Sequence, residues 1–190
     1  GIIDYKKNTI NIKLKFLQDN ENVIDKNYNI SDKIANKISN DIYQNITGTK
    51  GLFQTQFAFS LEKNTGKEIY LIDFNGKNLT QITNDNSLAI LPSWHPKKQL
   101  LLFTSYKENN PDLFCIDLKT NKITEISKQQ GLNISGNYSP KGTEISLTMT
   151  YNGNSEIIIL DSSGNFLSRI TNNKCIDSSS VWSNDGNKIY

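Results

Sequence analysis

The hydrophobic pattern from residue 56 onward consists of short apolar runs separated by turn-forming residues. In the segment 100–127, the runs LLLFTSY and LFCIDL are rich in β-branched and aromatic residues, KENNP and KTN interrupt them, and KITEIS alternates apolar with polar positions. These runs have the length of strands, whereas a packed helix needs roughly 10–12 residues. The pattern therefore predicts a succession of β-strands joined by turns.

This pattern recurs with an offset of 44 residues, the step between positions 68, 112 and 156. EIYLIDFNGKNLTQIT at 68–83 returns as DLFCIDLKTNKITEIS at 112–127 and as EIIILDSSGNFLSRIT at 156–171. A unit of four strands and roughly 40–45 residues is typical of a β-propeller blade. Two columns are filled alike in every copy, one by aspartate (Asp73, Asp117, Asp161) and one by a large aromatic residue (Trp94, Tyr138, Trp182). We expect the aromatic column to lie on the innermost strand of each blade and to pack in the core.

The first fifty residues follow a different pattern. Residues 9–17 alternate apolar and polar positions, 18–22 read as a turn, and 23–30 as a weaker strand, which together predict a hairpin. Residues 31–47 predict an amphipathic helix with Ser31 as its N-cap and Gly48 just beyond its end. Its apolar face is a series of isoleucines: Ile34, Ile38, Ile42 and Ile46. We therefore expect a small α/β unit over residues 1–50 and the strand repeats over 51–190, with the first repeated strand at about residue 56.

The charge and the composition argue against some classes of function. The formal net charge is only +2 and the lysines are scattered, which argues against nucleic acid as a partner because surfaces that bind it carry dense basic patches. No apolar run approaches the ~18 residues of a membrane-spanning helix. The sequence starts at Gly1 without a methionine and stops at residues 188–190, where a new strand would begin, so we expect it to be a piece of a longer protein.

The sequence contains no known catalytic or cofactor motif. It has no G-x-S-x-G elbow, no glycine-rich phosphate loop, and no cysteine or histidine cluster at metal-ligand spacing. The single histidine, His95, follows Trp94 in what we expect to be a surface turn, with a structural role. Because the aspartate column recurs in every copy, we expect it to accept hydrogen bonds from a neighbouring turn, whereas a catalytic pair would occur once. We therefore predict no catalytic residue, no cofactor and no metal.

The two cysteines occupy different columns. Cys115 stands where the sister copies have Leu71 and Ile159, which predicts a buried thiol, whereas Cys175 lies in a loop. Their spacing leaves open whether they form a disulfide, and two cysteines do not make a metal site.

The segments between the repeats differ most among the copies. If the strands of a blade are called A to D from the innermost outward, the D–A loops and the B–C hairpins lie on one face of a propeller. The D–A loops are TNDNSLAIL at 83–91, KQQGLNIS at 128–135 and TNNKCIDSS at 171–179. Divergent loops on a uniform scaffold allow a propeller to recognise a specific partner. We therefore predict a binding protein whose contacts lie on this face.

Four segments carry a resemblance to a known family. They are ITGTKGLFQTQFAFS at 46–60 and the blade motifs LPSWHPKKQ, GNYSPKGTEIS and SVWSNDGNKI. The chain resembles the TolB family of periplasmic proteins of the Tol–Pal system, in which a small α/β domain precedes a six-bladed β-propeller. The resemblance covers nearly the whole chain. It implies a mainly β fold with about three four-stranded blades of an incomplete propeller, preceded by the C-terminal part of the α/β domain.

The resemblance also implies a function. Members of the family are non-enzymatic scaffolds that bind the peptidoglycan-associated lipoprotein Pal with the propeller face, maintain the outer membrane and cell envelope, and take part in cell division. Colicins compete for the same face during import, and TolA, an inner-membrane protein, binds an N-terminal segment that we expect to be missing here. Association with membranes is then through partners only. Carried over by blade column, the Pal contacts point to Leu91, Leu132, Ser135, Ser178 and Ser179.

The sequence departs from the family pattern in one turn and a few side chains. His95 stands in place of serine, Lys97–Lys98 in place of Asp–Gly, and Tyr138 in place of tryptophan, while family members tend to have a bulkier polar residue at Leu132. Two alternatives remain open. One is the propeller of a prolyl-oligopeptidase-like hydrolase whose catalytic domain is absent, which the entry segment 1–50 disfavours. The other is a lyase- or glycosidase-like propeller, which would need a unique carboxylate or histidine pair at its channel.

Overall fold

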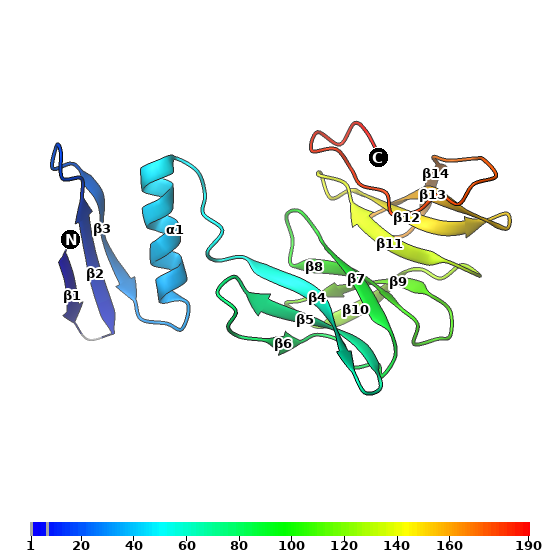
Figure 1. Ribbon diagram of the computed structural model, residues 1–190, viewed down its shortest axis with the longest axis horizontal. Coiled ribbons are helices and arrows are strands. Elements are labelled where there is room, and N and C mark those ends of the chain that lie inside the picture. Colours follow the sequence, from blue (N-terminus) through cyan, green and yellow to red (C-terminus); the bar gives the residue numbers. More distant parts are fainter. Residues whose placement is uncertain (1, 7) are drawn as a thin grey trace. The chain divides into compact units, whose positions relative to one another are not determined.

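The computed structural model of the chain describes residues 2–6 and 8–190 (Figure 1). These residues contain one helix and fourteen strands arranged in four sheets. The chain groups into two compact units, the first made of residues 1–57 and 72–79 and the second of residues 58–71 and 80–190. The helix of the described part has 14 residues and is too short and too polar to traverse a bilayer.

The first unit contains an antiparallel sheet and the helix. The strands are β1 (Ile2–Lys6), β2 (Thr9–Lys15) and β3 (Asn22–Asn29), and the helix is α1 (Ile34–Thr47). The predicted hairpin and helix are confirmed, and β1 is a strand that the pattern did not indicate. The helix packs on the sheet through an apolar cluster: Ile10, Ile12, Leu14, Ile24, Tyr28, Ile34, Ile38 and Ile42.

The two ends of the helix can be compared with the predicted N-cap and the predicted end at Gly48. The prediction of Ser31 as N-cap is wrong, because residues 31–33 are used to turn the chain out of β3. The Ser31 carbonyl accepts the N–H of Ile34 at 3.0 Å, and Lys33, which precedes the helix, makes no side-chain cap. Ile46 lies outside the apolar cluster and is 52% exposed, so the buried face ends one turn earlier than expected. Gly48 does end the helix, with a φ of 72° that suits glycine.

The second and third copies of the repeat each form an antiparallel sheet of four strands in sequence order. One sheet contains β7 (Ala89–Trp94), β8 (Leu100–Ser105), β9 (Asp112–Asp117) and β10 (Lys122–Ser127). The other contains β11 (Asn133–Tyr138), β12 (Glu144–Tyr151), β13 (Asn154–Asp161) and β14 (Phe166–Arg169). Two equal sheets from segments 44 residues apart confirm the prediction of four-stranded blades.

The first copy forms a smaller sheet of β4 (Gln56–Lys63), β5 (Gly66–Asp73) and β6 (Thr80–Gln81). By the 44-residue offset, β4 corresponds to β8, so this sheet contains the B, C and D strands of a blade. The expectation of four strands in every unit is therefore not met here. The reason is local: residues 48–55, which precede β4, form bends and turns between the helix and the sheet.

Apolar clusters fill the space between consecutive sheets. The cluster between the first two sheets contains Ile69, Leu71, Ala89, Leu101, Phe103, Phe114 and Ile116. The cluster between the second and third contains Leu102, Leu113, Cys115, Ile126, Tyr138, Ile145, Leu147, Met149, Ile158 and Leu160. The aromatic column packs as predicted: Trp94 lies against the first cluster, Tyr138 belongs to the second, and Trp182 is half-buried. Successive residues of β8 face opposite clusters, as expected for a strand buried on both sides.

The aspartate column holds turns in the second and third copies, as predicted. Asp117 and Asp161 each accept hydrogen bonds from two backbone N–H groups of the turn that follows. Asp73 differs, since it accepts hydrogen bonds from three side chains of the first unit. These are Lys33, Gln56 and Asn78. The recurring carboxylates are therefore structural.

Candidate partner-binding face

Three of the five predicted contact residues, Leu91, Ser135 and Ser179, occupy equivalent positions in successive copies. Leu91 and Ser135 lie at β-bulges in the innermost strands β7 and β11, where the register with the next strand shifts. All three residues have a positive φ, of 55°, 56° and 59°. Such a backbone is uncommon for any residue other than glycine, and bulges redirect the side chains of a strand. The same distortion in each copy gives this edge of the blades a common, defined shape.

The other two predicted residues lie in the loops between blades. Ser178 is exposed, and Leu132 is half-buried, with its backbone N–H donated to Thr150 Oγ1 at 2.9 Å. The 44-residue offset places Leu132 in one column with Leu88 and Ile176, which are 40% and 78% exposed. An aliphatic residue thus recurs in every D–A loop, and this signal, readable from the repeat alone, adds Leu88 and Ile176 to the predicted face.

Asn137 connects the inner strands laterally. Ser93 Oγ donates to Asn137 Oδ1 at 3.0 Å, and Asn137 Nδ2 donates to the carbonyl of Ser180 at 3.1 Å. The Asn137 carbonyl in turn accepts the indole N–H of Trp182 at 3.1 Å. Because these bonds cross between successive copies, Ser135 at the bulge of β11 and Ser179 beside Ser180 are held in fixed relative positions.

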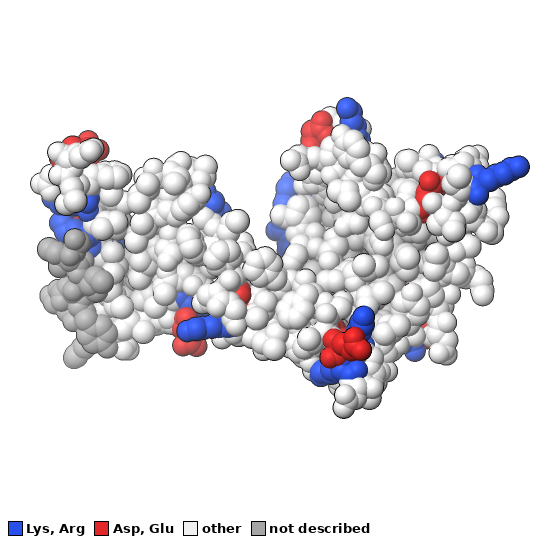
Figure 2. All heavy atoms as spheres, viewed as in Figure 1, with Lys and Arg blue, Asp and Glu red and all other residues white. Residues whose placement is uncertain are grey.

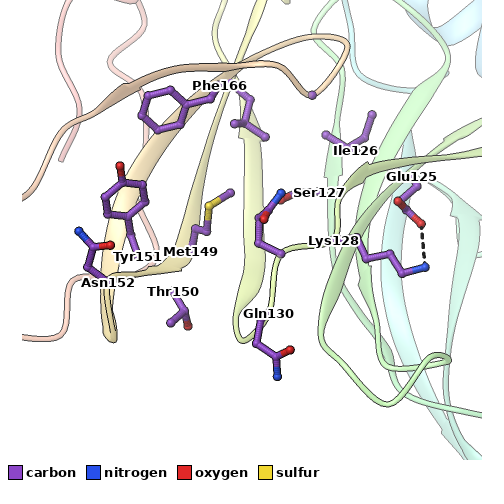
Figure 3. A pocket seen from close by; sticks show the side chains of 13 residues that line it. Glu125, Ile126, Ser127, Lys128, Gln130, Met149, Thr150, Tyr151, Asn152 and Phe166 are labelled. Atoms are coloured by element: carbon purple, nitrogen blue, oxygen red, sulfur yellow. Dashed lines mark ion pairs between the residues drawn. The ribbon is translucent and has the colours of Figure 1, made fainter.

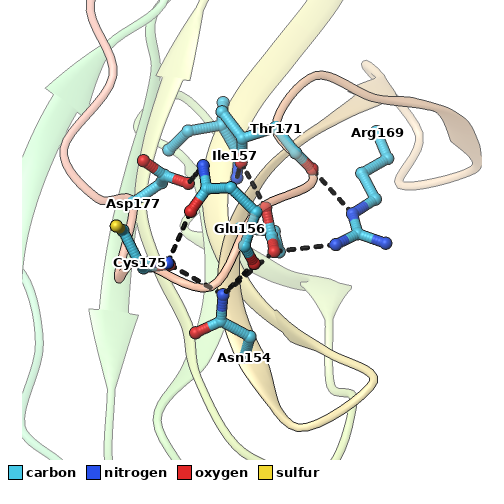
Figure 4. Close-up of polar contacts among 8 residues, drawn as sticks. Asn154, Glu156, Ile157, Arg169, Thr171, Cys175 and Asp177 are labelled. Atoms are coloured by element: carbon cyan, nitrogen blue, oxygen red, sulfur yellow. Dashed lines mark hydrogen bonds and ion pairs between the residues drawn. The ribbon is translucent and has the colours of Figure 1, made fainter.

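A buried carboxylate fixes the loop that follows the first and the third copy of the repeat. The column begins every repeat and contains Glu68, Asp112 and Glu156, each at most 2% exposed. In the third copy, Glu156 accepts a hydrogen bond from Thr171 Oγ1 and pairs with Arg169 at 2.7 Å (Figure 4). The hydrogen bond from Thr171, which has the largest effect, and the contact with Arg169 hold the pKa of Glu156 below its ordinary value. None of these carboxylates was among the predicted functional residues.

Neighbouring amides complete this attachment. The side-chain amide of Asn154 donates to the carbonyls of Asn173 and Cys175 at 2.9 and 2.7 Å (Figure 4). The Asp177 N–H donates to the Ser155 carbonyl at 3.0 Å. The loop after β14 is therefore tied to the β12–β13 turn along most of its length.

The other loops are fixed by related but different bonds. In the first copy, Glu68 accepts hydrogen bonds from Thr83 Oγ1 and from the N–H of Asn86. In the second copy the acid is the shorter Asp112, and the amide of Asn133 takes over. Its oxygen accepts the Ser127 hydroxyl at 2.6 Å and the N–H of Gln129 at 3.0 Å. Loops of different sequence are thus held rigidly on the same frame.

The environments of His95 and of the cysteines are structural. His95 lies in the turn after Trp94 as predicted, but the expected surface position is wrong, because the residue is 6% exposed and its ring packs edge-on against Tyr138. Both cysteines are free, Cys115 buried and Cys175 exposed. Burial raises the pKa of the Cys115 thiol, and its Sγ lies 3.4 Å from the Tyr138 hydroxyl. The Cys115 thiol is therefore neutral and unreactive.

Charged groups do not gather into a chemical site. Among the described residues, no group of three or more histidine, cysteine, aspartate or glutamate side chains is placed to hold a metal ion. On the face seen in Figure 2, lysines and acidic residues lie in small mixed groups, and neither sign forms a continuous patch. The most distinctive feature is the face formed by the D–A loops, whose paths are fixed by hydrogen bonds to the blades.

Comparison with known proteins agrees with the blade pattern. A family model described as the TolB beta propeller domain matches residues 43–190. The TolB homologue of Chlorobium chlorochromatii is 37% identical over 73 residues, which cover 38% of this chain and 17% of that protein. The Tol-Pal system protein TolB of Desulfosudis oleivorans is 33% identical over 76 residues, covering 40% of this chain and 17% of that protein.

Solved structures of other proteins have a similar fold. The crystal structure of TolB from Acinetobacter baumannii aligns with a TM-score of 0.87 and 23% identity over 98% of this chain, which spans about half (49%) of that TolB. A prolyl endopeptidase structure aligns with a TM-score of 0.53 and 14% identity over 68% of this chain and 20% of that chain, a likeness of fold only. Since the family model covers well over half of its residues, the chain belongs to the TolB β-propeller family.

Proposed function

We propose that this chain is part of a non-enzymatic scaffold of the Tol–Pal system that acts in the periplasm and binds the lipoprotein Pal with the D–A loop face. The observation that carries the proposal is the set of loops that differ in sequence but are each fixed by a buried polar side chain, Glu68, Asn133 or Glu156. A rigid, shaped surface without a cluster of reactive groups suits recognition of a protein partner better than catalysis. In this proposal residues 51–190 belong to the propeller and residues 1–50 to the preceding α/β domain.

The proposed contact residues divide into two kinds. Leu91 and Leu132 supply aliphatic surface, to which the loop residues Leu88 and Ile176 add more. Leu91 is 45% exposed, and burying such side chains at the centre of an interface is a usual source of affinity. Ser135, Ser178 and Ser179 supply hydrogen-bonding groups on a backbone already fixed by the bulges, so that little ordering is needed on binding. Colicins and the inner-membrane Tol proteins are further partners of the same proposal, as are roles in envelope integrity and cell division.

A loop exchange tests the proposal. In the full-length protein, residues 128–135 are replaced by the sister segment 84–91, which has the same length and occupies the same columns, except that Gly131 and Asn133 are retained because they fix the path of the loop. Affinity for purified Pal is measured by titration calorimetry. We expect at least about a tenfold loss, because the exchange replaces the side chains around Leu132 and Ser135 while retaining their backbone frame. Unchanged affinity would contradict the assignment of the face.

The matched control exchanges a turn on the opposite face. Replacing residues 118–121 by 162–165 is also gap-free and leaves the capping Asp117 in place. We expect Pal affinity to remain within about twofold for this variant. Hydrolysis of a peptide or glycoside ester by the full-length protein, with no retention of Pal, would favour an enzyme instead.

A further inference from the structure

A groove of about 660 Å³ lies between β10 on one side and β12, β13 and β14 on the other (Figure 3). Its floor is apolar and formed by Ile126, Met149 and Leu160, which are at most 9% exposed. This volume falls within the roughly 300–1,000 Å³ of ligand pockets. None of the predicted contact residues Leu91, Leu132, Ser135, Ser178 and Ser179 lines it, although its mouth includes residues 128–130 of the D–A loop at 128–135.

One wall of the groove is aromatic. The rings of Tyr151 and Phe166 stack with their centroids 6.2 Å apart and an interplanar angle of 22°. The Arg169 guanidinium lies over the Tyr151 ring at 5.1 Å, and its ion pair with the buried Glu156 fixes it there. Phe166 is 53% exposed. The result is a supported flat apolar surface that is open to a ligand.

The mouth of the groove carries amides. Gln129, Gln130 and Asn152 line it and are exposed, and within the described part of the chain none of their side-chain amides has a hydrogen-bond partner. Each amide offers both a donor and an acceptor. The groove thus combines a flat apolar wall with neutral groups that are free to donate and to accept.

The charges around the groove are already compensated. Lys128 pairs with Glu108 at 2.5 Å and with Glu125 at 3.4 Å, and Arg169 pairs with Glu156. Among the described residues at the groove, therefore, no cation lacks an acidic partner and could attract an anionic ligand. A neutral ligand is favoured, since a charged one would lose its hydration without gaining a partner.

We infer that this groove binds a neutral pyranose unit of an oligosaccharide. The C–H face of a pyranose is flat and apolar and matches the Phe166 ring, while its equatorial hydroxyls both donate and accept hydrogen bonds, as the three amides do. An extended peptide is the weaker alternative, because the unpaired polar groups at the mouth are side-chain amides. Sugar binding here does not depend on Pal binding, so the two can fail separately.

The test uses the full chain and three neutral probes: cellotetraose, chitotetraose and maltotetraose. Backbone amide NMR shifts are followed on titration. We expect saturable shifts with at least one probe, confined to residues 128–130, 150–152 and 164–166. Phe166→Ala should weaken that binding at least about fivefold, and Gln130→Ala about twofold to threefold.

The controls separate binding from folding. Leu167→Ala removes a neighbouring side chain that is equally exposed, at 50%, but lies outside the groove, and it should leave affinity unchanged. Phe166→Lys takes the residue that the second copy has at this position, Lys122, and should lose binding with an unchanged melting temperature. The proposal is overturned if no probe binds at about 10 mM, if binding survives Phe166→Ala, or if only an uncharged acetylated hexapeptide shifts these residues.

Discussion

His95 makes the stability of the blades depend on pH in a direction that its contacts determine. Its Nδ1 accepts the backbone N–H groups of Lys97 and Lys98, both at 3.0 Å, and its ring lies 4.6 Å from that of Tyr138. Accepting two N–H groups requires the neutral imidazole with its proton on Nε2. Burial lowers the pKa of His95, the charges of Lys98 and Lys97 lower it further, and a hydrogen bond with the Gly142 backbone opposes them.

The sign of the pH effect follows from this lowered pKa. In the unfolded chain a histidine takes up a proton near pH 6.5, whereas folded His95 remains neutral to lower pH. Below about pH 6.5 the unfolded state therefore binds more protons, and the free energy of unfolding falls by up to about 1.4 kcal/mol per pH unit. The loss continues until the pH reaches the folded pKa. At higher pH His95 contributes no pH dependence.

Substitutions separate the acceptor from the ring. His95→Ala removes two hydrogen bonds from the Lys97 and Lys98 N–H groups, worth about 1 kcal/mol each, and an aromatic contact worth about 1 kcal/mol, for a total of up to about 3 kcal/mol. His95→Ser supplies the hydroxyl that Ser139 has in the next copy, where Oγ accepts the Glu144 N–H, so it restores one acceptor in this turn and should cost less than His95→Ala. His95→Asn keeps an acceptor that does not titrate.

Urea unfolding followed by tryptophan fluorescence between about pH 5 and 8 measures these differences. The wild type should lose stability toward low pH more steeply than His95→Asn, with the two curves parallel above about pH 7. Because the sequence has one histidine, its NMR titration gives the folded pKa directly. Parallel curves over the whole range, or a folded pKa at or above 6.5, would refute the reasoning.

Three further predictions concern packing, reactivity and loop order. Leu101→Ala empties a fully buried position between the first two sheets and should reduce the free energy of unfolding by roughly 2–5 kcal/mol in a urea titration. A thiol reagent should modify Cys175 alone in the native chain and also Cys115 after denaturation, because burial excludes the reagent and raises the Cys115 pKa. Glu156→Gln should speed hydrogen exchange in the loop after β14, since it removes the ion pair and weakens the hydrogen bonds that hold that loop.

The Leu101→Ala and Glu156→Gln predictions each have a matched control variant. Leu167→Ala removes the same side chain from an exposed position and should cost less than about 0.5 kcal/mol. Glu108→Gln removes an acid whose ion pair is exposed and should leave exchange in the loop after β14 unchanged. A Leu101→Ala cost as small as that of the control would contradict the inter-sheet packing. Modification of both thiols in the native chain would contradict the burial of Cys115.

The blades were predictable because their information is local and repeated. A strand buried on both faces gives a continuous apolar run such as LLLFTSY, and three copies in register fix where each run begins. The turn-holding role of Asp117 and Asp161 is also local, since each carboxylate bonds to the residues that immediately follow it. Features set within a few residues were therefore read correctly from the residue types.

The features that escaped prediction depend on distant partners. Glu156 was not singled out because acidic residues are ordinarily exposed, and its partner Thr171 lies 15 residues away, just after β14. Ser31 has the right residue type for a cap, but the path of the chain from β3 into α1 uses it in a turn. Nothing in the type of Leu91 signals a left-handed backbone, which arises from the bulge between β7 and β8. His95 is buried by the neighbouring copy and not by its own turn.

The buried acidic residues explain how the loops between blades can vary in sequence without changing their path. A loop can change its outward side chains without changing its path only if something other than those side chains fixes the path. Glu68 and Glu156 do this from inside the blade, by accepting hydrogen bonds from Thr83 and Thr171 at the end of the last strand. In the second copy, where the acid is the shorter Asp112, the side chain of Asn133 makes the hydrogen bonds to the loop instead. The outer surface of each loop is therefore free to vary with the partner, while the inner attachment is constrained by the cost of leaving a buried carboxylate without hydrogen bonds.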